Sequence, residues 1–389
     1  MKKIAYVLEY GVIHPYSVQP DGSLSPLGNP VSCANAVGIA CPNVSKFSPK
    51  GDYLFVVSES ADQSEKTGAI SIYHVESDGS LTPKIDHYTN GVSDDPSYVI
   101  GFYVGSSLYY LYIDNFLIEN PLTEQIPGFR FLSSQASPEA LTPWTKNIQG
   151  LPDTVIGDIA TLELVPTPGA TPSYQAQFVL AIYQDTPAKK SQIVALSTNA
   201  FGLAYRGSGE INSANIDSDN EGNSLAADPN GKFVYVILDS MPTSAPNPLQ
   251  VVGFKLENGG QQFIPLGNVA HLPGSGNAGV VSQNGKYLFV AVAADILTNQ
   301  GENVVISYKI GVDGLLTKSD QKPCGFLGDN TVTLVIEPSG RYLYALSEFG
   351  GTIQVYEIND DDGSLTTKLT ISVDTQVNSV LIDMVVIDM

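Results

Sequence analysis

The sequence is poor in the residues that most often build disulfides, zinc sites and anion-binding sites. Its 389 residues include three cysteines, four histidines and one tryptophan, and its only arginines are Arg130, Arg206 and Arg341. Cys33 and Cys41 lie eight positions apart with no second pair nearby, so the cysteines fit neither a disulfide framework nor a metal-binding motif. A chain of this length can bury enough apolar surface to fold without either.

Positive charge is also scarce. There are 40 acidic residues against 19 basic ones, which gives a formal net charge of -21. Such a balance argues against nucleic acid or an anionic membrane as a partner. It is compatible with solubility alone, with a cation, or with a neutral or cationic small-molecule ligand, and it leaves a protein partner open.

Long apolar runs and the common nucleophile and phosphate-binding motifs are missing as well. The N-terminal MKKIAYVLEY begins like a signal peptide, but Glu9 ends its apolar run and no small-residue cleavage site follows. No run reaches transmembrane length, so we expect a cytoplasmic protein. There is no GxSxG, P-loop or HExxH motif, and the glycine-rich 274–279 is not followed by a predicted helix.

What the sequence does contain is an internal repeat. Segments 47–60, 228–240, 282–295 and 337–349 each read as a strand end, a turn centred on glycine, and a strand rich in aromatic and β-branched residues. The turn glycines are Gly51, Gly231, Gly285 and Gly340, with Gly105 in a weaker copy at 103–115. Gly51 to Gly105 is 54 positions, Gly231 to Gly285 is 54, and Gly285 to Gly340 is 55. The gap of 126 between Gly105 and Gly231 has room for two units, the extra one marked by the strand at 175–185.

A second signature completes each unit. Segments 69–84, 304–318 and 352–368 read as strand, Asp-Gly turn, strand, which is a strong hairpin signal. One unit is therefore four antiparallel strands, a to d, and radially repeated four-stranded units are propeller blades.

The two ends of the chain complete one more unit. Residues 4–28 read as strands b, c and d, and the C-terminal NSVLIDMVVIDM reads as the missing strand a. We therefore predict an all-β fold, a single seven-bladed β-propeller domain over residues 1–389, closed by both termini so that no sheet edge stays open.

The alternation of PxGxYLYVxxE with IxVYxIxxDGSLT resembles the seven-bladed lactonase-like propellers, a family that includes the bacterial propeller-type 6-phosphogluconolactonases and the fungal carboxymuconate cycloisomerases. The resemblance is strongest over 43–84, 223–256, 277–318 and 331–368 and poor over 119–175. It implies a ligand site on the face formed by the b–c and d–a connections, which we call the mouth face; the face with the a–b and c–d turns is the turn face. The repeats themselves are structural and do not specify an activity.

Acidic residues end strand b in nearly every blade, and amides gather near the start of strand a. Carboxylate and amide oxygens suit a hard cation such as Ca²⁺ or Mg²⁺, which could activate water against a lactone. The alternative is that these side chains accept hydrogen bonds from their own loops. The predicted metal ligands are Glu9, Glu59, Asp114, Asp239 and Glu348, and the predicted amide ligands are Asn43, Asn223 and Asn277.

The four histidines lie in or next to two kinds of predicted strand. His14 and His74 fall in predicted c strands, where a structural role is favoured. His87 and His271 follow predicted d strands near the mouth face, and with Glu59 they are the predicted catalytic residues.

The sequence departs from the family pattern in its cations. The phosphogluconolactonase-like members carry a His-Pro-His type segment and several arginines on the ligand face, whereas this chain has no HxH. Arg341 is predicted in an a–b turn, which leaves Arg130, in or near a d strand, and Arg206, just before a d–a loop, as anion binders. A phosphate or dicarboxylate substrate needs arginine clamps, so neither phosphogluconolactone nor carboxymuconate is expected.

One long predicted d–a loop, 133–153, contains Trp144. Long loops in compact domains are often lids, so Trp144 is a candidate contact for a sugar ring or a cation, or it packs the loop down. Three functions remain open from the sequence. They are a hydrolase of a small neutral or sugar lactone, a non-enzymatic binding propeller without the family's catalytic residues, and a cycloisomerase.

Overall fold

The computed structural model describes residues 2–41, 52–60, 68–89, 92, 96–103, 108–115, 125–145, 159–166, 177–185, 190–211, 220–240, 249–293, 303–324, 331–373 and 380–389. Every regular element within these ranges is a β-strand or an isolated bridge. No helix in this part of the chain is long and apolar enough to cross a membrane.

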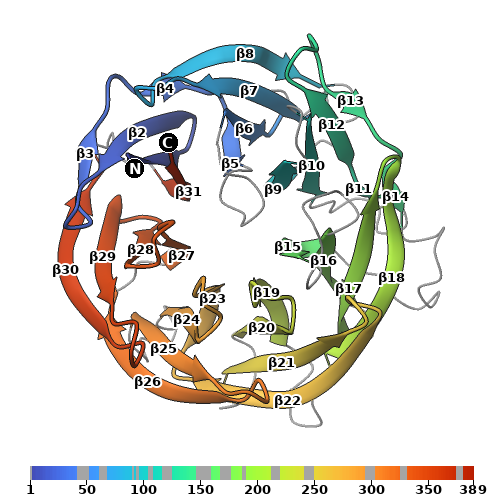
Figure 1. Cartoon of the computed structure of the whole chain (residues 1–389), viewed down its shortest axis with the longest axis vertical. Helices are drawn as coiled ribbons and strands as arrows, with labels where there is room; N and C mark the ends of the chain where they lie inside the picture. The colour runs from blue at the N-terminus through green and yellow to red at the C-terminus, as the bar shows by residue number, and fades with distance from the viewer. Residues whose placement is uncertain are drawn as a thin grey trace.

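The described strands form seven blades around a central axis (Figure 1), which confirms the predicted fold. Strand a of each blade lies nearest the axis and strand d lies at the perimeter. We number the blades in chain order and give their strands from a to d. Blade 1 is β5 (Ala36–Ala40), β6 (Tyr53–Ser58), β7 (Ala69–Val75) and β8 (Leu81–Tyr88); blade 2 is β9 (Pro96–Tyr103), β10 (Leu108–Asn115), β12 (Gly128–Leu132) and β13 (Glu139–Ala140); blade 3 is β15 (Ile159–Pro166), β16 (Gln177–Asp185), β17 (Lys190–Asn199) and β18 (Gly202–Ile211).

The remaining blades follow the same order. Blade 4 is β19 (Asn220–Ala227), β20 (Phe233–Ser240), β21 (Leu249–Glu257) and β22 (Gln262–Leu272); blade 5 is β23 (Ser275–Val281), β24 (Tyr287–Ala293), β25 (Val304–Ile310) and β26 (Leu316–Pro323); blade 6 is β27 (Thr331–Ile336), β28 (Tyr342–Ser347), β29 (Thr352–Ile358) and β30 (Leu365–Ser372); blade 7 is β31 (Leu381–Asp388), β1 (Lys3–Glu9), β2 (Val12–Val18) and β3 (Leu24–Pro26). Three short strands add to this frame: β4 (Val31–Ser32) pairs with β2, and β11 (Gln125–Ile126) pairs with β14 (Trp144–Thr145).

Blade 7 closes the ring as predicted. The C-terminal strand β31 pairs antiparallel with the N-terminal β1, in a register that places Lys3 opposite Asp388 and Leu8 opposite Asp383. Both chain ends lie in this blade (Figure 1). Closure removes the open edges that would otherwise flank the first and last units of the repeat.

Two details of the predicted blades were wrong. Strand a of blade 1 is Ala36–Ala40, so Asn43 follows this strand instead of opening it; Asn43 itself lies outside the described residues. In blade 2 the strand with Arg130 pairs with β10 on one side and with β13 on the other, so Arg130 lies on strand c and not on a d strand. The short strand d therefore lies inside the segment 133–153 that was predicted to be one loop.

The core consists of seven apolar clusters, one between each pair of neighbouring blades within the described residues. Side chains alternate along strand b, so each strand serves two clusters. In β1, Ile4, Tyr6 and Leu8 face blade 1, whereas Ala5 and Val7 face blade 6. Cys33, Cys41 and Cys324 are buried, and none of the three forms a disulfide.

The two sequence signatures meet across the blade interfaces. A strand-b tyrosine donates its hydroxyl hydrogen to the glycine carbonyl in the c–d turn of the next blade. This bond joins Tyr6 to Gly79 at 3.0 Å, Tyr235 to Gly314 at 2.9 Å and Tyr344 to Gly22 at 2.9 Å. The aromatic strand and the turn therefore recur together because each blade docks on the next.

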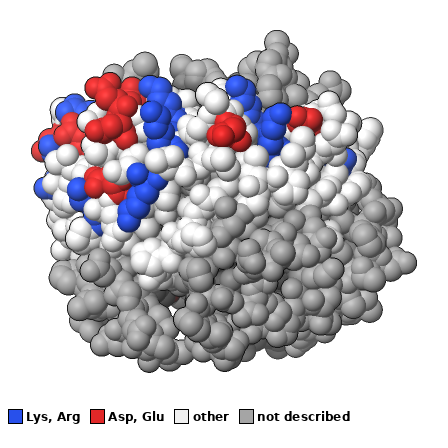
Figure 2. All heavy atoms as spheres, turned by 90° about the horizontal axis from the view of Figure 1, so that it is seen from below, with Lys and Arg blue, Asp and Glu red and all other residues white. Residues whose placement is uncertain are grey.

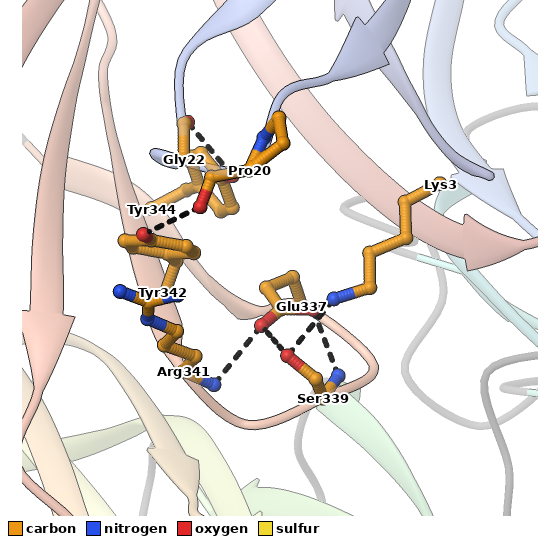
Figure 3. Close-up of polar contacts among 8 residues, drawn as sticks. All are labelled: Lys3, Pro20, Gly22, Glu337, Ser339, Arg341, Tyr342 and Tyr344. Carbon is orange, nitrogen blue, oxygen red and sulfur yellow. Dashed lines mark hydrogen bonds and ion pairs between the residues drawn. The ribbon is translucent and has the colours of Figure 1, made fainter. Parts of the chain in front are cut away.

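The interface between blades 6 and 7 has a further polar contact on the turn face (Figure 3). Lys3 Nζ of β1 lies 2.5 Å from Glu337 Oε2, whose side chain is fully buried. Burial raises the pKa of Glu337, but hydrogen bonds from Lys3, Ser339 and the Arg341 N–H outweigh it and leave this pKa below its ordinary value. The N-terminal strand is thus held to blade 6 by a charge as well as by apolar packing.

Candidate functional site

All seven strands a share one irregularity. Each carries a β-bulge in its pairing with strand b, near its first residues and therefore on the mouth face. A bulge redirects side chains and is frequent beside functional sites. The extra residue is Val37, Ser97, Asn223, Asn277, Val332 or Ile382 in six blades and lies within 160–161 in blade 3.

The predicted acidic residues end strand b beside these bulges. Glu9, Asp114 and Asp239 lie in strand b itself, whereas Glu59 and Glu348 directly follow it. The backbone thus places all five on the mouth face, at equivalent positions in five blades. Glu59 and Glu348 are half-buried, and the side chains of Asp114 and Asp239 lie outside the described residues.

Glu9 makes the most specific contact of this group. Its Oε2 lies 2.6 Å from Nε2 of His14, and both side chains are nearly buried, with exposed fractions of 6% and 10%. The two-residue turn Tyr10–Gly11 joins β1 to β2 and places Val7 opposite His14, so Glu9 lies diagonally across the hairpin from the imidazole. The predicted metal ligand Glu9 is therefore engaged by a histidine for which a structural role was favoured.

The contact links the protonation of the two side chains. When Glu9 is ionised its carboxylate can only accept a hydrogen bond, and Nε2 of His14 then carries the proton. In the neutral imidazole the basic lone pair is then on Nδ1, and the carboxylate stabilises the imidazolium that forms if Nδ1 takes a proton. Glu9 and His14 together have the parts of a general base and its orienting group.

Asp383 is a buried carboxyl that the sequence analysis did not single out. It lies in β31, and its Oδ2 accepts a hydrogen bond of 3.2 Å from the Ile39 N–H in strand a of blade 1. Its Oδ1 accepts a second one of 2.7 Å from the Met384 N–H. Burial raises the pKa of Asp383 to about 7, although both hydrogen bonds act to lower it. The signal in the sequence is an acidic residue with apolar residues on both sides in the C-terminal strand.

The predicted amides have different outcomes. Asn223 and Asn277 are the extra residues of two bulges, so both lie on the mouth face at the axial strand. Asn277 is half-buried and its Oδ1 accepts a hydrogen bond of 3.4 Å from Ser275 Oγ. The Asn223 side chain lies outside the described residues.

The other predicted catalytic residues lie away from the axis. His87 and His271 are exposed and fall within the perimeter strands β8 and β22, not after them. In blade 1, two strand spacings of about 4.8 Å each separate strand d, which holds His87, from strand b, which Glu59 follows. His271 lies in blade 4, so the two histidines and Glu59 are not on adjacent strands, and their catalytic role stays a prediction.

The predicted anion binders also have partners elsewhere. Arg130 forms an ion pair with Glu139 of the adjacent strand d, and this hydrogen bond raises the pKa of Arg130. Arg206 lies within β18, where its guanidinium donates to the carbonyl oxygen of Asn258 at 3.2 Å. Asn258 belongs to the c–d turn of blade 4, so this contact is directed to the turn face.

The segment with Trp144 runs along the outside of the ring. Trp144 pairs with Ile126 through the backbone, and Thr142 N donates to the carbonyl oxygen of Phe201 at 2.9 Å in the c–d turn of blade 3. The Trp144 side chain and residues 146–153 lie outside the described residues, so a role as a lid stays a prediction.

Some of the described charged side chains form ion pairs on the turn face. In the side view of Figure 2 the described charged side chains gather along one rim. Ion pairs of the turn face include Lys286 with Asp360 and Arg341 with Glu357. Among the described residues, no group of three or more His, Cys, Asp or Glu side chains is arranged to hold a metal ion.

The fold is a seven-bladed β-propeller whose ring is closed by the pairing of the N-terminal and C-terminal strands. No protein-family model matches the chain, and no curated protein is significantly similar to it in sequence. Solved structures do match. One is a "putative 6-phosphogluconolactonase" from Bacteroides uniformis ATCC 8492, with a TM-score of 0.70 and 18% identity over 99% of each chain.

Two other structures agree with this result. A protein of the same description from Bacteroides fragilis NCTC 9343 has a TM-score of 0.71 and 18% identity over 100% of this chain and 98% of its own. The periplasmic gluconolactonase of Pseudomonas aeruginosa has a TM-score of 0.71 and 16% identity over 100% and 99%. At these identities the similarity establishes the fold shared with these proteins and not their activity.

Proposed function

We propose that this protein hydrolyses a small neutral or sugar lactone at the mouth of its channel. The observation that carries the proposal is the hydrogen-bonded pair of Glu9 and His14 beside the bulged strand a of blade 7. The likeness to proteins described as gluconolactonases supports the reaction class. The few arginines favour a substrate without phosphate or dicarboxylate groups.

The proposed hydrolysis uses the His14 tautomer that has its proton on Nε2 and its basic lone pair on Nδ1. Nδ1 of His14 takes a proton from a water molecule while its oxygen attacks the lactone carbonyl carbon, and Glu9 stabilises the imidazolium. The bond between the carbonyl carbon and the ring oxygen then breaks, and the imidazolium returns the proton to the departing oxygen. The product is a hydroxy acid, whose ionisation releases one proton to the solution.

The proposal also includes a divalent cation at this site, and its participation is tested separately. Ca²⁺ or Mg²⁺ held by Glu59 and the other strand-end acids would polarise the carbonyl. The equivalent backbone positions of these acids around the mouth support it. If the cation takes part, a chelator removes activity and added Ca²⁺ or Mg²⁺ restores it.

A binding propeller without catalysis is the second candidate. The observation that favours it is the burial of Glu9 and His14, because a pair that is only 6% and 10% exposed can also serve to hold a hairpin. On this alternative a small molecule or protein binds the mouth face unchanged. The cytoplasmic location stays a prediction.

The two candidates are separated by proton release from neutral lactones. The wild-type protein should release protons from δ-valerolactone or gluconolactone faster than the buffer background. Glu9→Gln, which keeps the shape and one acceptor oxygen, should lower kcat by about 100-fold or more. The exposed pair of His74 and Glu76 provides the matched control, and Glu76→Gln should leave kcat unchanged. Wild-type protein without activity above background would favour the binding propeller.

A further inference from the structure

Two neighbouring blades carry the same pattern at the mouth face, a glutamate followed by an aromatic residue and a glycine. The b–c turns of blades 7 and 6 begin Glu9-Tyr10-Gly11 and Glu348-Phe349-Gly350. Tyr10 is 50% exposed and Phe349 is 60% exposed. The other large exposed apolar residues of the described chain lie in or next to c–d turns, on the opposite face: Phe201, Ile264, Val312 and Leu315.

One peptide unit fixes the two turns relative to each other. The carbonyl oxygen of Val380 accepts a hydrogen bond of 3.0 Å from the Tyr10 N–H. The N–H of Leu381, at the other end of the same peptide bond, donates to the carbonyl oxygen of Glu348 at 3.1 Å. Standard bond lengths then limit the Cα separation of Tyr10 and Phe349 to at most about 13 Å. The two aromatic residues therefore lie on opposite sides of the first residues of β31.

The surroundings favour a neutral polyol ring over other ligands. A pyranose has apolar C–H faces that pack on aromatic rings and hydroxyl groups that donate to carboxylates. Each aromatic residue directly follows a strand-end carboxylate, Glu9 or Glu348. Anionic ligands are disfavoured because the chain is strongly acidic and Arg341, the arginine of blade 6, lies on the turn face.

We propose that Tyr10 and Phe349 form an aromatic platform that binds a neutral pyranose ring at the channel mouth between blades 6 and 7. The inference deepens the proposed function, on which it rests for its substrate class, by assigning a sugar lactone rather than an aliphatic one. The platform lies beside Glu9, so a sugar held there presents its ring to the edge of the Glu9 and His14 pair.

The test measures binding of methyl β-D-glucopyranoside, which has no lactone bond, by saturation-transfer NMR titration. Tyr10→Ala and Phe349→Ala should each weaken binding by about five- to tenfold. Tyr10→Phe keeps the ring and should stay within about twofold of wild type. Phe201→Ala removes an exposed aromatic side chain on the turn face and is the matched control, with unchanged affinity expected. Thermal unfolding of each variant confirms that it is folded.

Three results would overturn the platform. They are no saturable binding to wild type, unchanged affinity in both alanine variants, and displacement of the glucoside by tetramethylammonium at lower concentration, which would make this a cation site. Because the glucoside cannot be hydrolysed as a lactone, its binding is read independently of activity. Loss of the proposed hydrolase with sugar binding intact would refute only the catalytic assignment.

Discussion

Replacing Asp383 with asparagine should change how the stability of this propeller depends on pH. Asp383 lies in the strand that closes the ring and accepts hydrogen bonds from Ile39 in blade 1 and from Met384. Burial raises its pKa from an ordinary 3.8 to about 7. The folded protein therefore holds this proton more tightly than the unfolded chain does.

The direction and size of this pH dependence follow from the difference in proton binding between the folded and unfolded states. The free energy of unfolding contributed by Asp383 falls as pH rises from about 4 to about 7 and is level above that. The difference of about three pH units between the two pKa values corresponds to about 4 kcal/mol. Asp383→Asn removes this dependence, and loss of one of the two acceptors costs about 1 kcal/mol. The variant should be slightly less stable than wild type near pH 4 and more stable by up to about 3 kcal/mol near pH 8.

Urea unfolding of both proteins between pH 4 and pH 9 measures this difference. Subtracting the two curves cancels the general repulsion of a chain with a net charge of -21. Asp360→Asn, at an exposed turn position, serves as the control and should run parallel to wild type. If the free energy of unfolding of Asp383→Asn changes with pH in the same way as that of wild type across the whole range, the raised pKa of Asp383 is refuted.

Three further predictions concern the interface between blades 6 and 7 and the acidic residues that end strand b. Tyr344→Phe leaves the Gly22 carbonyl without its hydroxyl donor and should lower the free energy of unfolding by about 1–2 kcal/mol in urea titrations, whereas Tyr10→Phe should not change it. Lys3→Met removes the cation from buried Glu337 and should cost about 2–4 kcal/mol; adding Glu337→Gln should recover part of this loss, and a strictly additive double mutant would contradict the pairing. If a divalent cation assists hydrolysis, Glu59→Gln should raise the Ca²⁺ or Mg²⁺ concentration required for half-maximal activity, and full activity of this variant in chelator would exclude the cation.

Most of the fold was predictable because its signals are local and repeated. Turn glycines at intervals of 54 and 55 residues and the Asp-Gly hairpins mark the blades directly. The error at Asn43 arose because residues before a turn were assigned to strand a, whereas the true strand, Ala36–Ala40, lies further from the turn. This strand has three small residues in five, Ala36, Gly38 and Ala40, and so gives little strand signal of its own.

The candidate site was less predictable because it depends on contacts between distant positions. Asp383 and Ile39 are 344 positions apart, and no local pattern joins them. The pair of Glu9 and His14 was within reach, since a two-residue turn at Tyr10–Gly11 sets the hairpin register and so places the two side chains on one face. His87 and His271 lie within strand d and not after it, because the sequence does not mark where this exposed strand ends, and their catalytic role stays a prediction.

In the proposed function, His14, oriented by Glu9, acts as the base in lactone hydrolysis. The most direct measurement compares kcat for proton release from gluconolactone in wild type, His14→Asn and His74→Asn, each checked for an unchanged thermal unfolding profile. The account predicts a loss of about 100-fold or more for His14→Asn alone. Equal kcat values in all three proteins, or no hydrolysis by wild type above background, would contradict it.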